Sequence, residues 1–251
     1  MMMSSFSVVV PVHDEADLLR RCLPSVFGLG ASEYVFVLDR CGDDSGSVIN
    51  VMAAKFGLCD KVFVVRLSER NGADFCCRLA YVRWVGRRLA CSDVVVEVDA
   101  DLIVDSSCLG LIESFGGSGL SCLSFLHKDY PVGFRNLLKR LYVRVGLPFS
   151  WLGAIMVYRR CDALAVEDLA VLKGIELAED TLLHDGLRGL GPTKCVVSGV
   201  IHLRPKADSV LQGRLSWTVG CRGWMVCLLR GFALFDFGFL RGYINARFCR
   251  S

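Results

Sequence analysis

Residues 94–105, VVVEVDADLIVD, constrain the fold of this chain more than any other segment. A β-branched run this apolar is typical of a strand buried on both faces, as in a parallel sheet that helices cover. The run ends in two carboxylates, Asp99 and Asp101, spaced one residue apart. Two carboxylates at a strand end can share one hard divalent cation, and such a cation binds phosphates. The same D-x-D pattern is also typical of a turn or N-cap Asp beside a solvated Asp. Other parts of the chain must therefore decide between a metal site and a structural role.

Strand-like and helix-like segments alternate through the first hundred residues. Apolar runs at 6–12, 33–38 and 61–67 predict strands, and amphipathic segments at 14–30, 47–56 and 74–89 predict helices. Asp14 is the predicted N-cap of the first helix. With the run at 94, the order is β-α-β-α-β-α-β. Because each helix has the length of a crossover connection, this order predicts an α/β fold with a right-handed, mostly parallel central sheet and helices on both faces.

The second half of the chain continues with strands expected at 120–126, 151–159 and 195–203 and an amphipathic helix at 174–191. No low-complexity or Pro/Ser-rich linker interrupts the 251 residues, so we expect a single domain over residues 1–211. We divide this domain into two halves, residues 1–105 and 106–211.

Bulk composition excludes some classes of protein. Hydrophobic residues make up 53% of the chain and the mean hydropathy is +0.45. No unbroken apolar segment, however, approaches the roughly 20 residues of a membrane-spanning helix. The formal net charge of +3 is too small to indicate a nucleic-acid-binding protein.

Thirteen cysteines are scattered through the chain without a C-x-x-C pair, which argues against a zinc site of the ribbon type. Most are expected to be small buried side chains in a reducing compartment. Residues 1–7 lack the basic stretch, apolar run and cleavage site of a signal peptide. We therefore expect a cytoplasmic protein.

Residues 212–251 form a C-terminal extension with an amphipathic pattern. Apolar and aromatic side chains recur at helical spacing from Trp217 to Phe239, and arginines share the opposite side. Such a helix is typical of peripheral contact with a membrane, here its inner face. Packing on the protein's own core explains the pattern equally well, and several glycines disfavour one continuous helix.

Chemically competent side chains follow three of the predicted strands. His13 and Glu15 come directly after the first strand, Asp39 after the second, and Asp99 and Asp101 after the fourth. Each has a structural explanation, because acids favour helix N-termini and cap turns. In α/β folds, however, ligands bind at the edge where parallel strands end. Acids at three such strand ends therefore predict a binding site at that edge.

Four motifs carry these residues: PVHDE at 11–15, LDRCGDDS at 38–45, an RNG…R segment at 70–78 and EVDAD at 97–101. In order and spacing they resemble the nucleotide-sugar half of family 2 glycosyltransferases, which have the GT-A fold. The resemblance implies an enzyme that transfers a sugar from a nucleoside diphosphate sugar to an acceptor. It also implies that residues 1–105 are the nucleotide-sugar-binding half of the domain and residues 106–211 the acceptor half. His13 and Asp14 stand where a Tyr or Ser and an Asn are more usual, which leaves the base and the sugar open.

The resemblance also implies a donor site and a metal site. The residues carried over to the donor site are Pro11, His13, Glu15, Asp39, Arg78, Asp99 and Arg204. Asp99, Asp101 and His202 correspond to ligands of Mg²⁺ or Mn²⁺. His202, at the end of the last predicted strand, is equally well explained as a structural histidine. Arg204 follows it with a guanidinium that matches phosphate oxygens.

The acidic pair Glu179 and Asp180 lies near the start of the helix expected at 174–191. Acids in a first helical turn interact favourably with the helix dipole, which by itself explains them. In family 2 enzymes an E-D pair here supplies the base for the acceptor hydroxyl, so the resemblance assigns that role to Asp180, with Glu179 beside it. It also implies inversion at the sugar carbon. The acceptor, whether a polyprenyl phosphate, a saccharide or a small metabolite, stays open.

Two other functions share some of these features. A nucleotidyltransferase also has a nucleotide-binding α/β sheet and an acidic metal site, but normally carries a Gly-rich loop with Arg or Lys after the first strand. The segment VPVHDEADLL has no glycine and no lysine. A non-catalytic, membrane-associated module of the same fold would need no base at Asp180.

Overall fold

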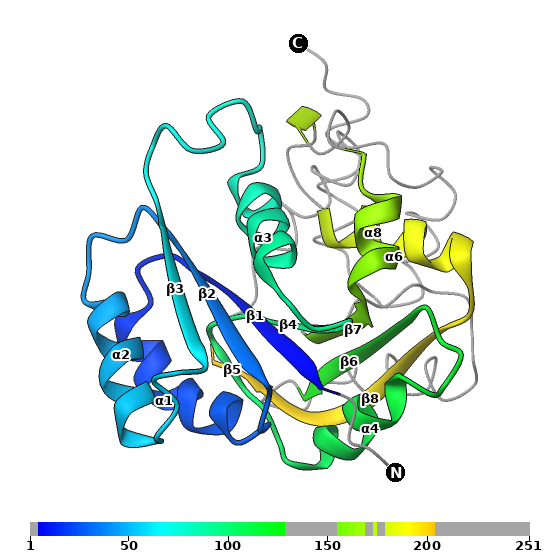
Figure 1. Cartoon of the computed structure of the whole chain (residues 1–251), viewed down its shortest axis with the longest axis horizontal. Coiled ribbons are helices and arrows are strands. Elements are labelled where there is room, and N and C mark those ends of the chain that lie inside the picture. Colours follow the sequence, from blue (N-terminus) through cyan, green and yellow to red (C-terminus); the bar gives the residue numbers. More distant parts are fainter. Residues whose placement is uncertain (1–4, 129–154, 169–172, 175–178, 204–251) are drawn as a thin grey trace, which may run out of the picture.

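The computed structural model describes residues 5–128, 155–168, 173–174 and 179–203. Its elements in chain order are β1 (Phe6–Val12), α1 (Ala16–Phe27), β2 (Glu33–Asp39), α2 (Ser45–Lys55), β3 (Val62–Leu67), α3 (Arg78–Leu89), β4 (Val94–Val98), β5 (Leu102–Ile103), α4 (Ser107–Phe115), β6 (Cys122–Lys128), β7 (Ile155–Arg159), α6 (Arg160–Val166), α8 (Glu179–Leu190) and β8 (Thr193–His202). The strands form one eight-stranded sheet in the order β3-β2-β1-β4-β7-β6-β8-β5 (Figure 1).

The first half of the chain forms the parallel part of this sheet. β2 pairs in parallel with β3 and β1, and β1 pairs in parallel with β4. Every residue of β1, β2 and β4 is buried, as their apolar runs predict for strands covered on both faces. In the second half, β7 pairs antiparallel with β4 and β6, and β5 with β8, whereas β6 and β8 are parallel. The predicted mostly parallel sheet is confirmed, and each antiparallel pair among the described strands contains β7 or β8.

Helices cover both faces of the sheet, as predicted (Figure 1). Alternate residues of β1 point to opposite faces: Val8 and Val10 pack with α1, α2 and α4, while Val9 packs with α3, α6 and α8. Helix α3 approaches β1 very closely at Gly86, where a side-chain Cβ would collide with Val9. The two apolar layers fix α3 and α8 on one face, next to the end of β4.

Three local details differ from the sequence prediction. Asp14 is not the N-cap of α1; it adopts a positive φ of 51° and its carboxylate accepts a hydrogen bond from the Gly42 N–H at 2.7 Å. The N–H of Ala16 is instead capped by the Asp43 carboxylate at 2.8 Å, from the loop after β2. Helix α3 begins at Arg78, four residues later than predicted, because the preceding residues form turns.

The run at 94–105 is divided between two strands. β4 ends at Val98, and Leu102–Ile103 form β5, which pairs with the end of β8. The break places Asp99 and Asp101 in a turn between the two strands.

Three further features are the burial of the cysteines, the length of the helices and the C-terminal extension. Of the ten cysteines in the described part of the chain, four are buried (Cys22, Cys77, Cys108 and Cys122), two are half-buried and four are exposed, so the expectation that most are buried is wrong for these residues. In the described part of the chain, no helix is both long enough and apolar enough to cross a membrane. The extension at 212–251 lies outside the described residues, so its amphipathic helix stays a prediction.

Candidate active site

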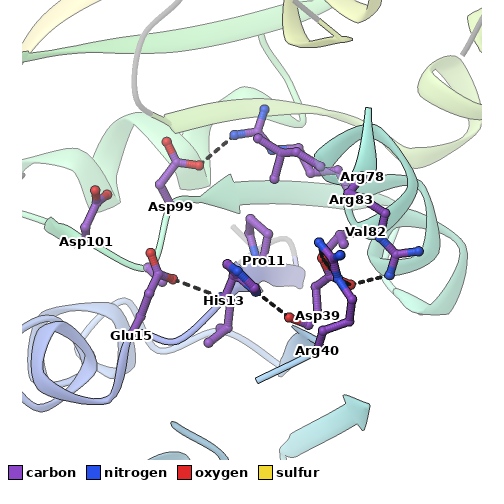
Figure 2. A pocket seen from close by; sticks show the side chains of 13 residues that line it. Pro11, His13, Glu15, Asp39, Arg40, Arg78, Val82, Arg83, Asp99 and Asp101 are labelled. Atoms are coloured by element: carbon purple, nitrogen blue, oxygen red, sulfur yellow. Dashed lines mark hydrogen bonds and ion pairs between the residues drawn. The ribbon is translucent and has the colours of Figure 1, made fainter. Parts of the chain in front are cut away.

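A pocket of about 350 Å³ opens where β1, β2 and β4 end. It is lined by Pro11, Val12, His13, Glu15, Asp39, Arg40, Arg78, Leu79, Val82, Arg83, Asp99, Ala100 and Asp101 (Figure 2). The structure thus gathers seven of the residues that the sequence selected for donor and metal binding. They meet because parallel strands place their carboxyl ends at one edge of the sheet.

The end of β1 is held against the end of β2. His13 Nδ1 lies 2.6 Å from the backbone oxygen of Asp39. The Glu15 carboxylate accepts a hydrogen bond from the His13 N–H at 3.4 Å, and the Glu15 N–H donates to Ser45 Oγ at 3.0 Å. Glu15 is 8% exposed. These contacts orient the PVHDE motif toward the pocket.

Two guanidiniums hold the carboxylate of Asp39. Arg40 Nη2 lies 3.1 Å from Asp39 Oδ2, and Arg78 Nη2 donates to Asp39 Oδ1. Burial alone would raise the pKa of Asp39, but the hydrogen bonds from Arg78 and Arg40 outweigh it and lower that pKa. Arg78, which the resemblance assigns to the donor site, therefore lies in the pocket wall paired with Asp39.

The lowered pKa of Asp39 makes its contribution to stability depend on pH. An unfolded Asp titrates near pH 3.9, and the folded carboxylate titrates lower, so its contribution is present above that pH and is lost as pH falls through the folded pKa. We expect the difference in unfolding free energy between wild type and Asp39→Asn to be largest at about pH 7 and to shrink at about pH 3. Urea unfolding at both pH values measures it, with exposed Asp60→Asn as the control. A difference that does not change with pH would contradict this.

The two acids of the D-x-D motif have different surroundings. The Asp99 side chain is 35% exposed and accepts a hydrogen bond from Arg83 Nη2 at 2.6 Å. The Asp101 side chain is 6% exposed, and its Oδ2 lies 3.5 Å from Nε2 of His202. The pairing of Leu102 with His202 brings the end of β8 to this turn. The sequence could not have shown that contact, because it depends on the β5–β8 register.

The donor set at this turn suits a hard divalent cation. Carboxylate oxygens from Asp99 and Asp101 and the imidazole nitrogen of His202 are ligand types that Mg²⁺ and Mn²⁺ accept. The set is not drawn together as a closed cluster, because Asp99 is turned toward Arg83. These three residues therefore fit the predicted metal as ligands that one bound ion would gather. Arg204 lies outside the described residues.

A different group among the described residues has metal-like spacing. Ligand atoms of Asp14, Cys41 and Asp43 all lie within 4.8 Å of one another. The carboxylates of Asp14 and Asp43 already accept backbone N–H groups of Gly42 and Ala16. We assign this group to the connection between the β2 loop and α1.

The acidic pair predicted on the acceptor side begins α8. Glu179 is 6% exposed, and its Oε1 accepts a hydrogen bond from Arg83 Nη1 at 3.0 Å. Burial raises the pKa of Glu179, although the charge of Arg83 opposes the rise. Asp180 is partly exposed beside it. Arg83 was not selected from the sequence, because it lies outside the four motifs and only its partners in the fold distinguish it from Arg87 and Arg88.

A buried arginine lies one turn further along α3. Arg87 is 2% exposed and contacts Glu97 of β4 at 2.5 Å through Nη1. Its Nε donates to Glu167, just after α6, at 2.5 Å. This triad ties α3 to β4 and to the segment after α6, behind the D-x-D turn. It too was missed from the sequence.

Comparisons with known proteins agree with this arrangement. The family model described as glycosyl transferase family 2 matches residues 7–143, more than half of the chain. A search of curated proteins found no match. A mannosyltransferase from Pyrobaculum calidifontis in complex with GDP-Man and Mn²⁺ superposes with a TM-score of 0.66 at 16% identity, covering 98% of this chain and 76% of that one.

Two further solved structures have the same fold. Glucosyl-3-phosphoglycerate synthase from Mycobacterium tuberculosis, with Mn²⁺, UDP and phosphoglyceric acid, has a TM-score of 0.59 at 20% identity and covers 90% of this chain and 78% of that one. TarS from S. aureus has a TM-score of 0.60 at 18% identity and covers 96% and 78%. These similarities establish the GT-A fold. Together with the family match, they show that the chain belongs to glycosyl transferase family 2.

Proposed function

We propose that this protein transfers a sugar from a nucleoside diphosphate sugar to an acceptor, with Mn²⁺ or Mg²⁺ as cofactor. The observation that carries the proposal is the pocket at the ends of β1, β2 and β4, which brings carboxylates and guanidiniums from the four motifs together. The superposed mannosyltransferase and glucosyl-3-phosphoglycerate synthase were solved with Mn²⁺ and nucleotide ligands. Family membership disfavours the nucleotidyltransferase and the non-catalytic alternatives.

The residues around the pocket divide into two parts of the donor site. Pro11, His13, Glu15 and Asp39 would contact the nucleoside, because they lie at the ends of β1 and β2. Asp99, Asp101 and His202 would hold the cation beside the diphosphate. When bound, the cation neutralises negative charge on the leaving diphosphate. Arg78 adds a positive charge at the pocket wall. Arg204 belongs to this site on sequence grounds alone.

The acceptor is activated by Asp180 in this proposal. Glu179 and Asp180 begin α8, and Glu179 is joined to Asp99 through Arg83. A carboxylate there can take the proton of an acceptor hydroxyl that attacks the sugar carbon from the face opposite the diphosphate, with inversion. The acceptor class, polyprenyl phosphate, saccharide or small metabolite, is chosen by parts of the site beyond these residues.

A thermal-shift panel tests the function directly. Nucleoside diphosphate sugars, each with Mn²⁺, are added to the full chain, and the one that binds is expected to raise the melting temperature, because binding to the folded state alone stabilises it by about 2.7 kcal/mol at 100 times Kd. A panel in which no nucleotide sugar raises the melting temperature at millimolar concentration would overturn the proposal.

Asp101→Ala is expected to remove metal-dependent binding of the nucleoside diphosphate, because it deletes an oxygen ligand from a buried position. Isothermal calorimetry with UDP or GDP and Mn²⁺ measures the loss. Asp60→Ala, an exposed change at the opposite end of β3, serves as the control. Equal affinity of Asp101→Ala and wild type would remove Asp101 from the metal site.

Peripheral membrane contact through residues 212–251 is a separate part of the proposal and rests on their amphipathic pattern. Full-length protein is expected to co-sediment with anionic liposomes more than a chain that ends at residue 211. Equal pelleting of both forms would discard this contact.

A further inference from the structure

Arg83 connects the two sides of the proposed active site. It lies on α3 and reaches Asp99, at the end of β4, with Nη2 at 2.6 Å. Its Nη1 reaches Glu179, at the start of α8, at 3.0 Å. The two carboxylates lie on elements 80 residues apart in the sequence, and one rigid guanidinium spans them. This side chain therefore links the D-x-D turn directly to the first turn of α8.

The surrounding carboxylates hold the Arg83 guanidinium in this position. Burial alone would lower the pKa of Arg83, but the carboxylates of Asp99 and Glu179, with further contributions from Glu97 and Asp180, raise it well above its usual value. Arg83 thus stays charged and is shared among acids of β4, the D-x-D turn and α8. Cys77 Sγ also contacts the Glu179 carboxylate, at 3.9 Å from Oε2.

Arg83 differs from Arg87 in its access to the pocket. Arg87 is enclosed, with a side chain 2% exposed, and it does not line the pocket. Arg83 does line the pocket, its side chain is 11% exposed, and its partner Asp99 is 35% exposed. The Nε of Arg83 is buried without a hydrogen-bond partner. One end of the bridge is therefore open to whatever binds in the pocket, while the Glu179 end is closed.

We propose that Arg83 is a positioning residue that couples occupation of the donor site at Asp99 to the placement of Glu179, and with it Asp180, on the acceptor side. This inference rests on the proposed function. A cation that binds Asp99 competes with Arg83 Nη2 for the same carboxylate. The strength of the ion pair between Glu179 and Arg83 decides how readily Arg83 releases Asp99. Glu179 is not among the residues that line the pocket, and Arg83 is the described side chain that connects its carboxylate to Asp99.

A double-mutant cycle tests the coupling by a binding measurement. The affinity for UDP or GDP with Mn²⁺, whichever binds to wild type, is measured by calorimetry for Glu179→Gln, Arg83→Gln and the double variant. With Glu179 neutral, Arg83 holds Asp99 more strongly, so Glu179→Gln is expected to weaken binding about fivefold. In the Arg83→Gln background the same change is expected to have no further effect. Arg83→Lys, which keeps the charge but not the fork, is expected to restore only part of the coupling.

Asp185→Asn is the matched control, because it neutralises an exposed acid on the same helix that contacts His184 and not Arg83. The melting temperature of each variant is recorded to separate folding from coupling. Two results would overturn the inference alone. One is an unchanged affinity of Glu179→Gln, and the other is an affinity loss in the double variant that equals the product of the two single losses. Failure of wild type to bind any nucleotide with Mn²⁺ would overturn the proposed function as well, so the two failures are distinguishable.

Discussion

Asp180→Asn is expected to lower the rate of sugar transfer by about 100- to 10,000-fold, the range that a positioned general base contributes. The amide keeps the size and hydrogen-bonding shape of the carboxylate but cannot accept the acceptor's proton. Binding of the nucleoside diphosphate with Mn²⁺ should change little, because Asp180 does not line the donor pocket. Release of nucleoside diphosphate in the presence of acceptor measures the rate, and calorimetry measures the binding.

Asp185→Asn, five residues along the same helix, is the control for this experiment, since its exposed side chain faces His184. It should retain the wild-type rate. A transfer rate for Asp180→Asn within a factor of about three of wild type would show that Asp180 is not the base. An acceptor phosphate that is already ionised would give the same result. The acceptor is therefore identified with the wild-type protein before the variant is measured.

Arg87→Met is expected to destabilise the fold by about 3–5 kcal/mol, the cost of leaving buried carboxylates without their counter-charge. Glu97 and Glu167 both face this guanidinium, and their side chains are 6% and 5% exposed. Burial already raises the pKa of Glu167 against the opposing charge of Arg87, so loss of that charge favours protonation or local unfolding. Urea unfolding at about pH 7 measures the change in free energy.

Arg88→Met provides a matched control on the same helix. Arg88 is exposed and lies over the Trp84 ring at 4.9 Å, a contact worth about 1 kcal/mol or less at such a site. A triple variant that also carries Glu97→Gln and Glu167→Gln should recover much of the lost stability, because no unpaired charge remains. Similar losses for Arg87→Met and Arg88→Met would mean that the triad is not what holds α3 to β4.

The first half of the fold was predictable because its strands are continuous apolar runs joined by crossover-length helices. A run such as FSVVVPV has one stable place, the interior of a covered sheet, and the right-handed crossover rule then fixes the order of its neighbours. The edge at which Glu15, Asp39 and Asp99 meet followed from the same rule. The predicted start of α1 was wrong. Its cap is Asp43, which comes from a loop that only the tertiary structure brings near the helix.

The second half was less predictable for a related reason. β5 has two residues, and its pairing with the end of β8 depends on a register that no local pattern encodes. That pairing alone places His202 at 3.5 Å from Asp101. From the sequence His202 was explained equally well as a metal ligand or as a structural residue, and its role as a ligand stays a proposal.

What the sequence by itself determined is therefore the α/β class, the order of the first elements and the acids that line one edge of the sheet, because hydrophobic periodicity and strand direction are local properties. What only the tertiary structure decided is which charges meet. Arg83, Arg87 and Arg88 look alike along α3, yet one bridges Asp99 and Glu179, one is buried with Glu97 and Glu167, and one is exposed. Ion pairs between residues as far apart as 83 and 179 depend on how helices pack on the sheet, and that packing is a property of the whole chain.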